Sequence, residues 1–352
     1  MNHHHRTSFI LAACTLAVPT AAMAEQSDTN TNSPNHFSFA ARAGFNISAK
    51  FKNLGNLTLH PNQRTTPNGK PYNYDNGYVY KDVSGSVDGQ TWNWGYDNSA
   101  SQISGNTILM NRSSVGANVS SPNGVDRSDA NYGAEFVYNR ELGKHGKMTY
   151  GLEVAANYLR VDLNDHSSFF GSATRTTDAY AFTPGTTPPQ APPAYQGSFD
   201  GPGFVIGSTP VSSTAAALPG GAAIVGNREF NANIWGLRLG PYVEFPLCNT
   251  VNLSLSAGLA AALVNGSASW SETAFITGGG TATGSGSGHD LSMLYGGYVN
   301  AKVEWQLSER WSAEGGVQFQ TLSSYEHNFS GRTVELDLSQ SIFITLGAGY
   351  KF

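Results

Sequence analysis

Residues 334–352, the last part of the chain, alternate between apolar and polar side chains. One side is formed by Val334, Leu336, Leu338, Gln340, Ile342, Ile344, Leu346, Ala348, Tyr350 and Phe352. A period of two is the side-chain repeat of an extended strand, so the segment predicts one long β-strand with an apolar and a polar face. Strands in soluble proteins are usually about five or six residues long, so this length is unusual for a soluble sheet.

The same alternation recurs upstream, and the segments together predict about eight strands. They are residues 39–48, 132–139, 150–158, 235–245, 251–263, 298–307 and 311–320. The connections alternate in length. Residues 143–147, 248–250 and 308–310 are short turns, and residues 51–131, 166–227 and 274–288 are long loops. Residues 184–203 are rich in Pro and Gly and predict a mobile part of the second long loop.

Short turns at one end and long loops at the other indicate a transmembrane up-and-down antiparallel β-barrel, with extracellular long loops. Aromatic residues at strand ends fit the membrane interfaces; they are Phe39, Phe245, Trp305, Trp311, Tyr350 and Phe352. A lipocalin-like or sandwich fold would instead turn the apolar face inward. Small residues and balanced charges on the polar face favour the membrane barrel. A barrel of ten strands, with an extra pair near residues 90–98 and 107–111, is the alternative.

The final strand, "SIFITLGAGYKF", places Tyr350 two residues before the terminal Phe352. It resembles the C-terminal assembly signal of bacterial outer-membrane proteins. The chain is similar to the small eight-stranded barrels of the OmpA/OmpX/OmpW type. The resemblance implies location in the bacterial outer membrane, contact with outer-membrane lipids, insertion by the barrel-assembly machinery and a monomeric state.

The N-terminus predicts a secretory signal peptide over residues 1–24. "MNHHHR" is followed by the apolar "TSFILAACTLAVPTAA" and by the small-residue cleavage site in "AMAEQ". "LAAC", ending at Cys14, leaves a lipoprotein signal as the alternative. Residues 25–36 predict a disordered tail, and residues 37–352 the barrel.

Removal of the signal leaves a chain without basic blocks. Of the 20 basic side chains only Arg6 is lost, which leaves 19 against 25 acidic ones, a net charge of −6 with His neutral. No electrostatic basis for nucleic-acid binding is therefore present. Cys248 is the one cysteine left, so no disulfide is expected within the mature chain.

The inward side of the predicted strands carries charges of both signs. They are Arg42, Arg238, Lys302 and Lys351 with Glu135, Glu153, Glu244, Glu304 and Glu314. Side chains fill the interior of an eight-stranded barrel, and charges in a dry lumen persist only when they are paired. We expect a salt-bridged plug, with a gated polar pore as the alternative.

The first long loop contains "QTWNWGYDN", which places Trp92, Trp94 and Tyr96 on alternate positions. These rings could pack with Tyr78 and Tyr80 into a small core over the barrel mouth, which we favour. Alternatively they could remain exposed and stack on a glycan or a protein surface, because exposed aromatic patches of this size usually have a partner.

The sequence favours a non-enzymatic outer-membrane barrel that acts in surface integrity or in surface interaction through its loops. A narrow porin-like channel is the first alternative. A lipid-modifying enzyme is the second, because "SSYEHNFS" brings Ser323, Ser324, Glu326, His327 and Ser330 to one predicted loop tip. Their spacing matches no catalytic motif, and no residue spacing predicts a catalytic residue, a cofactor or a metal.

Overall fold

The computed structural model describes residues 35–57, 65, 69–83, 85, 87–116, 125–126, 130–277 and 280–352. The predicted signal peptide, residues 1–24, and the predicted tail up to residue 34 lie outside this part of the chain. Within it, no helix has the length and apolar character that crossing a membrane requires.

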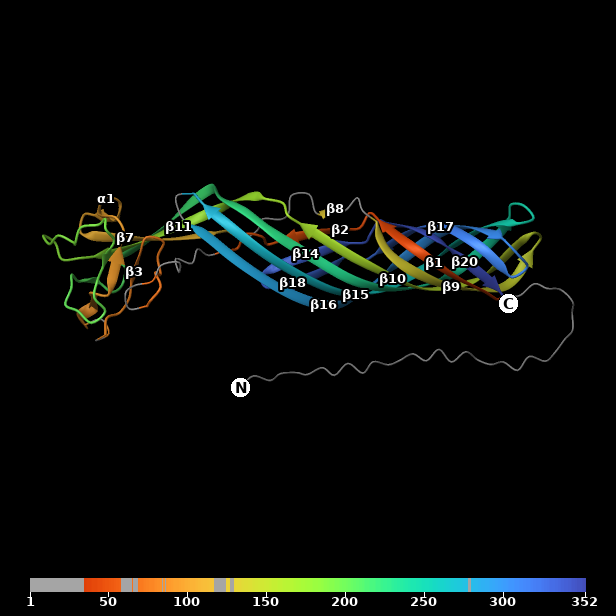
Figure 1. Cartoon of the computed structure of the whole chain (residues 1–352), viewed down its shortest axis with the longest axis horizontal. Coiled ribbons are helices and arrows are strands. Elements are labelled where there is room, and N and C mark those ends of the chain that lie inside the picture. Colours follow the sequence, from red (N-terminus) through yellow and green to blue (C-terminus); the bar gives the residue numbers. More distant parts are fainter. Residues whose placement is uncertain are drawn as a thin grey trace. The chain divides into compact units, whose positions relative to one another are not determined.

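Eight antiparallel strands form a closed barrel (Figure 1). They are β1 (Asn35–Phe45), β9 (Asn131–His145), β10 (Met148–Asp165), β14 (Ser212–Pro246), β15 (Val251–Ile276), β16 (Thr281–Gln306), β17 (Trp311–Leu322) and β20 (Ser341–Lys351). Each pairs with the next in this order, and β20 pairs with β1 to close the ring. The eight-stranded prediction is confirmed, and the ten-stranded alternative is not.

The remaining elements lie in the connections between barrel strands. A four-stranded sheet joins β18 (Tyr325–Phe329), β19 (Arg332–Asp337), β2 (Ser48–Lys52) and β8 (Val125–Asp126). β11 (Phe169–Ala181) pairs with β14 and with β7 (Thr107–Val115), which pairs with β6 (Ile103–Ser104). The short elements are β3 (Gly77–Val79), η1 (Val87–Gly89), β4 (Gln90–Thr91), β5 (Trp94–Tyr96), α1 (Ser99–Gln102), β12 (Tyr195–Gln196) and β13 (Ile206–Gly207).

The barrel closes where its first strand meets its last. Register pairs run from His36 with Lys351 to Phe45 with Ile342. The Phe352 ring stacks on Phe37 with centroids 5.0 Å apart. Asn35 and His36 were predicted to lie in the disordered tail, but they are the first residues of β1. They are held in the strand because β1 has partners on both sides, β9 and β20.

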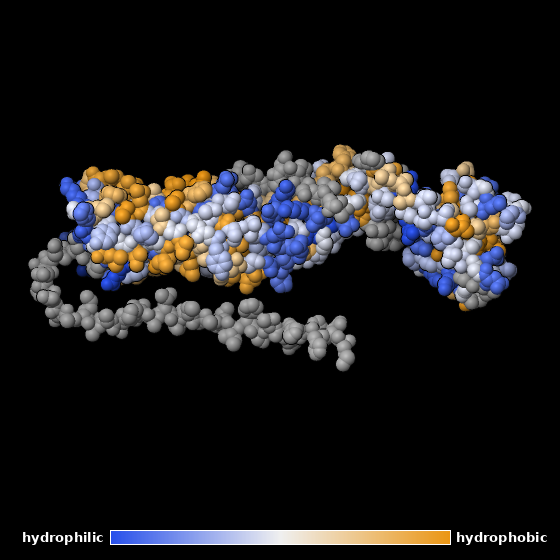
Figure 2. Space-filling model, turned by 180° about the vertical axis from the view of Figure 1, so that it is seen from behind, coloured by the Kyte–Doolittle hydropathy of each residue, from blue (hydrophilic) through white to orange (hydrophobic). Residues whose placement is uncertain are grey.

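A belt of exposed apolar side chains surrounds one end of the barrel. Leu259 is 73% exposed and Trp235 58%, although both lie in the middle of paired strands. Figure 2 shows such side chains gathered in orange over this end, with a hydrophilic band beside them. On β14 the belt runs from Trp235 to Phe245, a tilted length close to the apolar band of about 25 Å in such barrels. A closed barrel with an apolar exterior is the form in which strands cross a membrane, and the chain is an outer-membrane barrel.

The short turns lie at residues 146–147, 247–250 and 307–310, as predicted, on the same end as Asn35 and Phe352. This end is therefore periplasmic, and the long connections are extracellular.

The predicted strand over residues 334–352 is in fact two strands. β19 ends at Asp337 and β20 begins at Ser341. Val334 and Leu336 are fully buried, whereas Ile342 and Ile344 face lipid. The turn between the strands, in which Ser339 N–H donates to Asp337 Oδ1 at 2.8 Å, changes which alternate positions face inward. The sequence pattern passes through this turn unbroken because both strands carry apolar residues at even positions.

Residues 274–288 were predicted to form a long loop, and this is wrong. β15 and β16 pair as far as Phe275 and Thr281, so most of this segment belongs to paired strands. Three glycines of this segment face inward against other elements: a Cβ at Gly284 would overlap Leu57, one at Gly286 would overlap Ser330, and one at Gly288 would overlap Phe329. The glycines therefore permit close packing in a strand that extends beyond the membrane belt.

Residues 184–203 were predicted to be a mobile loop, yet the segment is packed. β12 pairs with β5, and Ala191 is buried. Ala191 exchanges two hydrogen bonds with Ser99, from Ser99 N–H to its carbonyl at 2.9 Å and from its own N–H to Ser99 Oγ at 2.8 Å. Partners from the other long loop supply the order that the segment's own composition does not predict.

Candidate functional site

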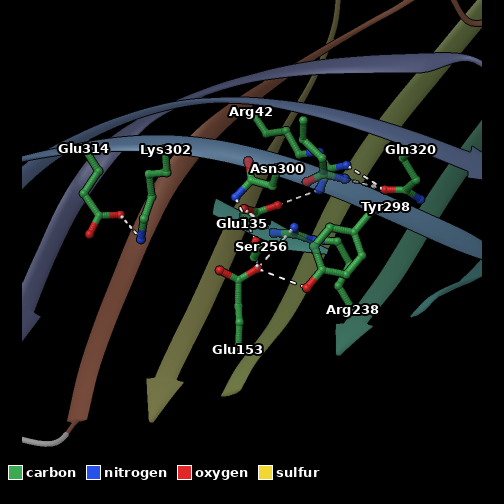
Figure 3. A network of polar contacts seen from close by, with 11 residues as sticks. Arg42, Glu135, Glu153, Arg238, Ser256, Tyr298, Asn300, Lys302, Glu314 and Gln320 are labelled. Carbon is green, nitrogen blue, oxygen red and sulfur yellow. Dashed lines mark hydrogen bonds and ion pairs between the residues drawn. The ribbon is translucent and has the colours of Figure 1, made fainter. Parts of the chain in front are cut away.

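Two arginines and two glutamates from four strands meet in the lumen, within the membrane belt (Figure 3). Arg42 of β1 and Arg238 of β14 each bind a different oxygen of Glu135, at 2.6 and 2.7 Å. Arg238 also lies 3.5 Å from Glu153 of β10. All four residues are buried. This arginine cluster cross-links β1, β9, β10 and β14 from inside the barrel.

Neutral side chains complete the arginine cluster. Glu153 accepts hydrogen bonds from Ser256 Oγ at 3.1 Å and from Tyr298 OH at 3.3 Å. The Arg238 guanidinium lies over the Tyr298 ring, 4.6 Å from its centroid. Arg42 donates to Gln320 at 3.2 Å. Because nearly every charge has a partner, the cluster fills the lumen with bonded side chains instead of leaving an aqueous path.

The other predicted lumen charges lie nearer the periplasmic end. Lys302 Nζ binds Glu314 Oε2 at 3.0 Å, and this pair lies apart from the arginine cluster in Figure 3. Lys351 Nζ binds Glu304 Oε1 at 2.7 Å. Glu244 is partly exposed and accepts a hydrogen bond from Asn252 at 2.8 Å. The predicted charges thus form two groups at different depths.

A further ion cluster, which the sequence reasoning missed, lies beyond the membrane belt. Glu272 of β15 binds Arg228 of β14 at 2.8 Å and Arg332 of β19 at 2.7 Å. Arg228 also binds Asp165 at 3.2 Å, and Gly55 N–H donates to Glu272 at 3.1 Å. Even-numbered residues of β14 face the lumen along the whole stretch from Arg228 to Arg238. That signal was lost because the predicted strands began at residue 235 and ended at residue 263, so neither Arg228 nor Glu272 fell within one.

An apolar layer separates the arginine cluster from this extracellular ion cluster. Along β14, the inward positions between Arg238 and Arg228 are Gly236, Ile234, Ala232 and Phe230. β10 contributes Leu159, Val161 and Leu163 to the same hydrophobic core. The interior is therefore stratified into charged, apolar and charged layers. An ion would have to leave water completely to cross it, which costs several kcal/mol or more without a partner.

The two longest connections build a head with its own aromatic core. Its buried members are Tyr74, Val79, Trp94, Tyr96, Ile108, Met110, Tyr180, Phe182, Ala191 and Ile206. Trp94 packs against Tyr195 with ring centroids 4.8 Å apart, and its Nε1 donates to the Phe204 carbonyl at 2.7 Å. This core is connected to the barrel by strand pairing: β7 pairs with β11, and β11 pairs with the barrel strand β14.

The tyrosines of the head are locked by hydrogen bonds and burial. Tyr74 OH lies 2.9 Å from Asp178 Oδ2 and 2.6 Å from Tyr180 OH. Arg112 binds the same Asp178 oxygen at 2.7 Å. Burial, followed by the hydrogen bonds to Tyr180 and Asp178, raises the pKa of Tyr74 far above its ordinary value. Tyr74 therefore stays neutral and serves as a structural hydrogen-bonding group.

Of the three rings in "QTWNWGYDN", Trp94 and Tyr96 are fully buried. In the folded head they belong to the packed core, so neither offers a ring face to a ligand. Trp92 is partly exposed and lies against the loop at Gly201, where a Cβ would overlap its indole. Trp92 is thus the one ring of the three that could meet a partner at the surface.

The predicted loop-tip residues do not assemble into a catalytic triad in the described structure. The His327 ring stacks on Phe329 with centroids 5.8 Å apart. Ser330 Oγ donates to the Ser287 carbonyl, and Ser323 Oγ accepts from Tyr295 N–H. Among the described residues, no hydrogen bond joins His327 to a serine or to Glu326.

One group of side chains in the described part of the chain could hold a metal ion. Ligand atoms of His36, Glu304 and Glu314 all lie within 4.8 Å of one another, and all three residues are buried. No metal-binding spacing is visible in the sequence, because the three residues come from β1, β16 and β17 and meet only through the barrel register.

Comparison with solved structures finds similarity to bacterial outer-membrane proteins. OprG from Pseudomonas aeruginosa is 10% identical, with 91% of this chain and 97% of that chain covered and a TM-score of 0.37. Ail, the attachment invasion locus protein of Yersinia pestis, is 8% identical, with 90% and 99% covered and a TM-score of 0.27. The outer membrane protease OmpT from Escherichia coli is 11% identical, with 93% and 99% covered and a TM-score of 0.30. No protein-family model and no curated protein matches the sequence.

Proposed function

We propose that this chain is a closed, non-enzymatic outer-membrane barrel that carries an extracellular head for interaction at the cell surface. The observation that carries the proposal is the contrast between its two ends. The lumen is filled by an apolar layer between two ion-paired layers, whereas the long loops form a head with a packed core of their own.

The filled lumen supports a closed barrel over a narrow diffusion channel. The arginine cluster spans the lumen through Arg42, Glu135, Arg238 and Glu153. The apolar layer follows directly, with Leu159 and Ile234 among its buried members. Opening a path would break ion pairs in a dry site and would also hydrate the apolar layer.

The ordered head supports a role in surface interaction. Ordering long loops costs conformational entropy, about 1–2 kcal/mol per residue for the backbone alone, and the barrel below is already closed without them. Binding residues are commonly placed on loops that a rigid scaffold holds in position. A partner with a flat apolar face and polar edges, such as a surface glycan, fits the partly exposed Trp92 ring.

Trp92→Ala is expected to weaken binding of a surface oligosaccharide about 5- to 150-fold, on the scale of the ~1–3 kcal/mol that a base stacked on an aromatic side chain contributes. The measurement is binding of purified, detergent-solubilised protein to a panel of bacterial and host-type oligosaccharides. Tyr132→Ala, in the lipid-facing belt, is the matched control and is expected to bind as the parent does. A parent protein that binds no member of the panel, or a variant that binds equally well, would count against glycan contact at Trp92.

A further inference from the structure

The periplasmic end of the lumen contains three side chains that converge from three strands. Glu304 of β16 and Glu314 of β17 lie directly opposite each other in the strand register. His36 of β1 reaches them across β20, and its Nε2 lies 3.0 Å from Glu314 Oε1. All three residues are at most 7% exposed.

His36 Nε2 and Glu314 Oε1 form an ion-pair contact at 3.0 Å, with angles that are poor for a hydrogen bond. Both atoms are buried, and neither has a hydrogen-bond partner of acceptable geometry. Two ligands of one tetrahedral zinc ion lie about 3.4 Å apart when the metal–ligand bonds are about 2.1 Å. The observed 3.0 Å is an ion-pair distance and is close to this separation, so the two atoms could share a cation after a small shift of either side chain.

The strand beneath these side chains leaves room for them. A Cβ at Gly349 of β20 would overlap His36 Nε2, Glu314 Oε1 and Ser312 Oγ. Ser312 Oγ is also buried without a hydrogen-bond partner. Only glycine at this position lets the three polar atoms gather over the backbone of β20.

At this depth of the lumen the carboxylates outnumber the ammonium groups, so the side chains around His36 carry a net negative charge. Three carboxylates, Glu244, Glu304 and Glu314, face two ammonium groups, Lys302 and Lys351, when His36 is neutral. Glutamates directly opposite each other on paired strands repel. Lys302 binds the second oxygen of Glu314 and leaves Oε1 available, whereas Lys351 is the more exposed ammonium and occupies Glu304.

We propose that His36, Glu304 and Glu314 form a binding site for a divalent transition-metal ion of the Zn²⁺ type. One imidazole and two carboxylates suit a borderline cation better than Mg²⁺ or Ca²⁺, which prefer oxygen ligands alone. The ion takes the place of the Lys351 ammonium on Glu304. It joins β1 to β16 and β17 across β20, and so fastens the seam where the first and last strands close the barrel.

The test is Zn²⁺ titration of the tag-free mature protein, folded in detergent, by calorimetry, together with the temperature at which the barrel loses its folded mobility on SDS gels. We expect one saturable site and a higher unfolding temperature with Zn²⁺ than with a chelator. His36→Gln is expected to weaken binding by about 100-fold, since even residues that only support metal ligands are worth about 10–100-fold. Gly349→Ala removes no ligand but is expected to weaken binding, because its Cβ would displace His36 Nε2 and Glu314 Oε1.

Two further variants separate this site from surface binding and from misfolding. His289→Ala removes an exposed histidine of β16 and is expected to bind Zn²⁺ as the parent does. Lys351→Met removes the competing ammonium and is expected to bind more tightly than the parent, a gain that a damaged fold would not produce. Failure of the parent to bind Zn²⁺ saturably, or unchanged binding by His36→Gln, would overturn the proposal.

Discussion

Replacing Arg238 with alanine is expected to lower the free energy of unfolding of the barrel by about 3–5 kcal/mol, the usual cost of removing one partner from a buried ion pair. Arg238 is 1% exposed and is shared between Glu135 and Glu153. Glu135 retains Arg42, but Glu153 retains only the hydroxyl groups of Ser256 and Tyr298. The measurement is equilibrium unfolding by denaturant in lipid vesicles.

The cause of this loss can be tested by also removing the Glu153 carboxylate, which has lost its arginine partner. Arg238→Met combined with Glu153→Gln is expected to recover a large part of the lost stability, because no uncompensated carboxylate remains. Arg160→Ala, an exposed arginine of β10, is the control and is expected to change stability by less than about 0.5 kcal/mol. An Arg238→Ala barrel as stable as the parent would show that the lumen is hydrated at this depth.

Trp94→Ala is expected to destabilise the head by about 3–5 kcal/mol, the usual cost of truncating a fully buried tryptophan. Trp94 is 0% exposed and packs on Tyr96, Tyr195 and Phe204. Its loss also removes the hydrogen bond to the Phe204 carbonyl. The measurement is amide hydrogen exchange, which should show faster exchange over β3, β5 and β12 and unchanged protection in the barrel strands.

The control for the head is Trp235→Ala, which truncates a tryptophan that faces lipid. It is expected to leave exchange in the head unchanged. Equal exchange in the head of Trp94→Ala and the parent would contradict a core that depends on this ring, and would return Trp94 to the list of possible ligand contacts.

Side-chain alternation predicted the membrane-embedded part of this fold well. Leu237, Arg238 and Leu239 show why: lipid and lumen impose opposite polarity on successive residues, so one strand reveals both environments. The same logic places Arg42, Glu135, Glu153 and Arg238 on the inward side of their strands, where all four are buried. It could not show that Glu135 is shared by two arginines, because that depends on register between strands.

The pattern failed where the protein leaves the membrane. Outside the belt, Ser267, Ser269 and Ser271 lie on the outward side, whereas Ala268 and Trp270 are buried on the inward side. The apolar face of β15 therefore changes sides although the strand continues. The extracellular ion cluster around Arg228 and Glu272 was lost with those strand extensions. The break between β19 and β20 was hidden for the opposite reason, since apolar residues continue through the turn with the same spacing.

The order of the head could not be predicted from any one segment, because the residues that pack together there come from different loops. Nothing near Ala191 indicates order, and its hydrogen bonds come from Ser99. In the same way His36 lies far from Glu304 and Glu314 in the sequence and meets them only when β1 closes on β20.

Conductance of the purified protein in planar lipid bilayers tests the central claim, a closed barrel, most directly. We predict a flat baseline without steady single-channel steps, because the arginine cluster, the apolar layer and the extracellular ion cluster lie in series across the lumen. An open eight-stranded pore requires all three layers to part together. Large, steady conductance from the unmodified protein would contradict this account.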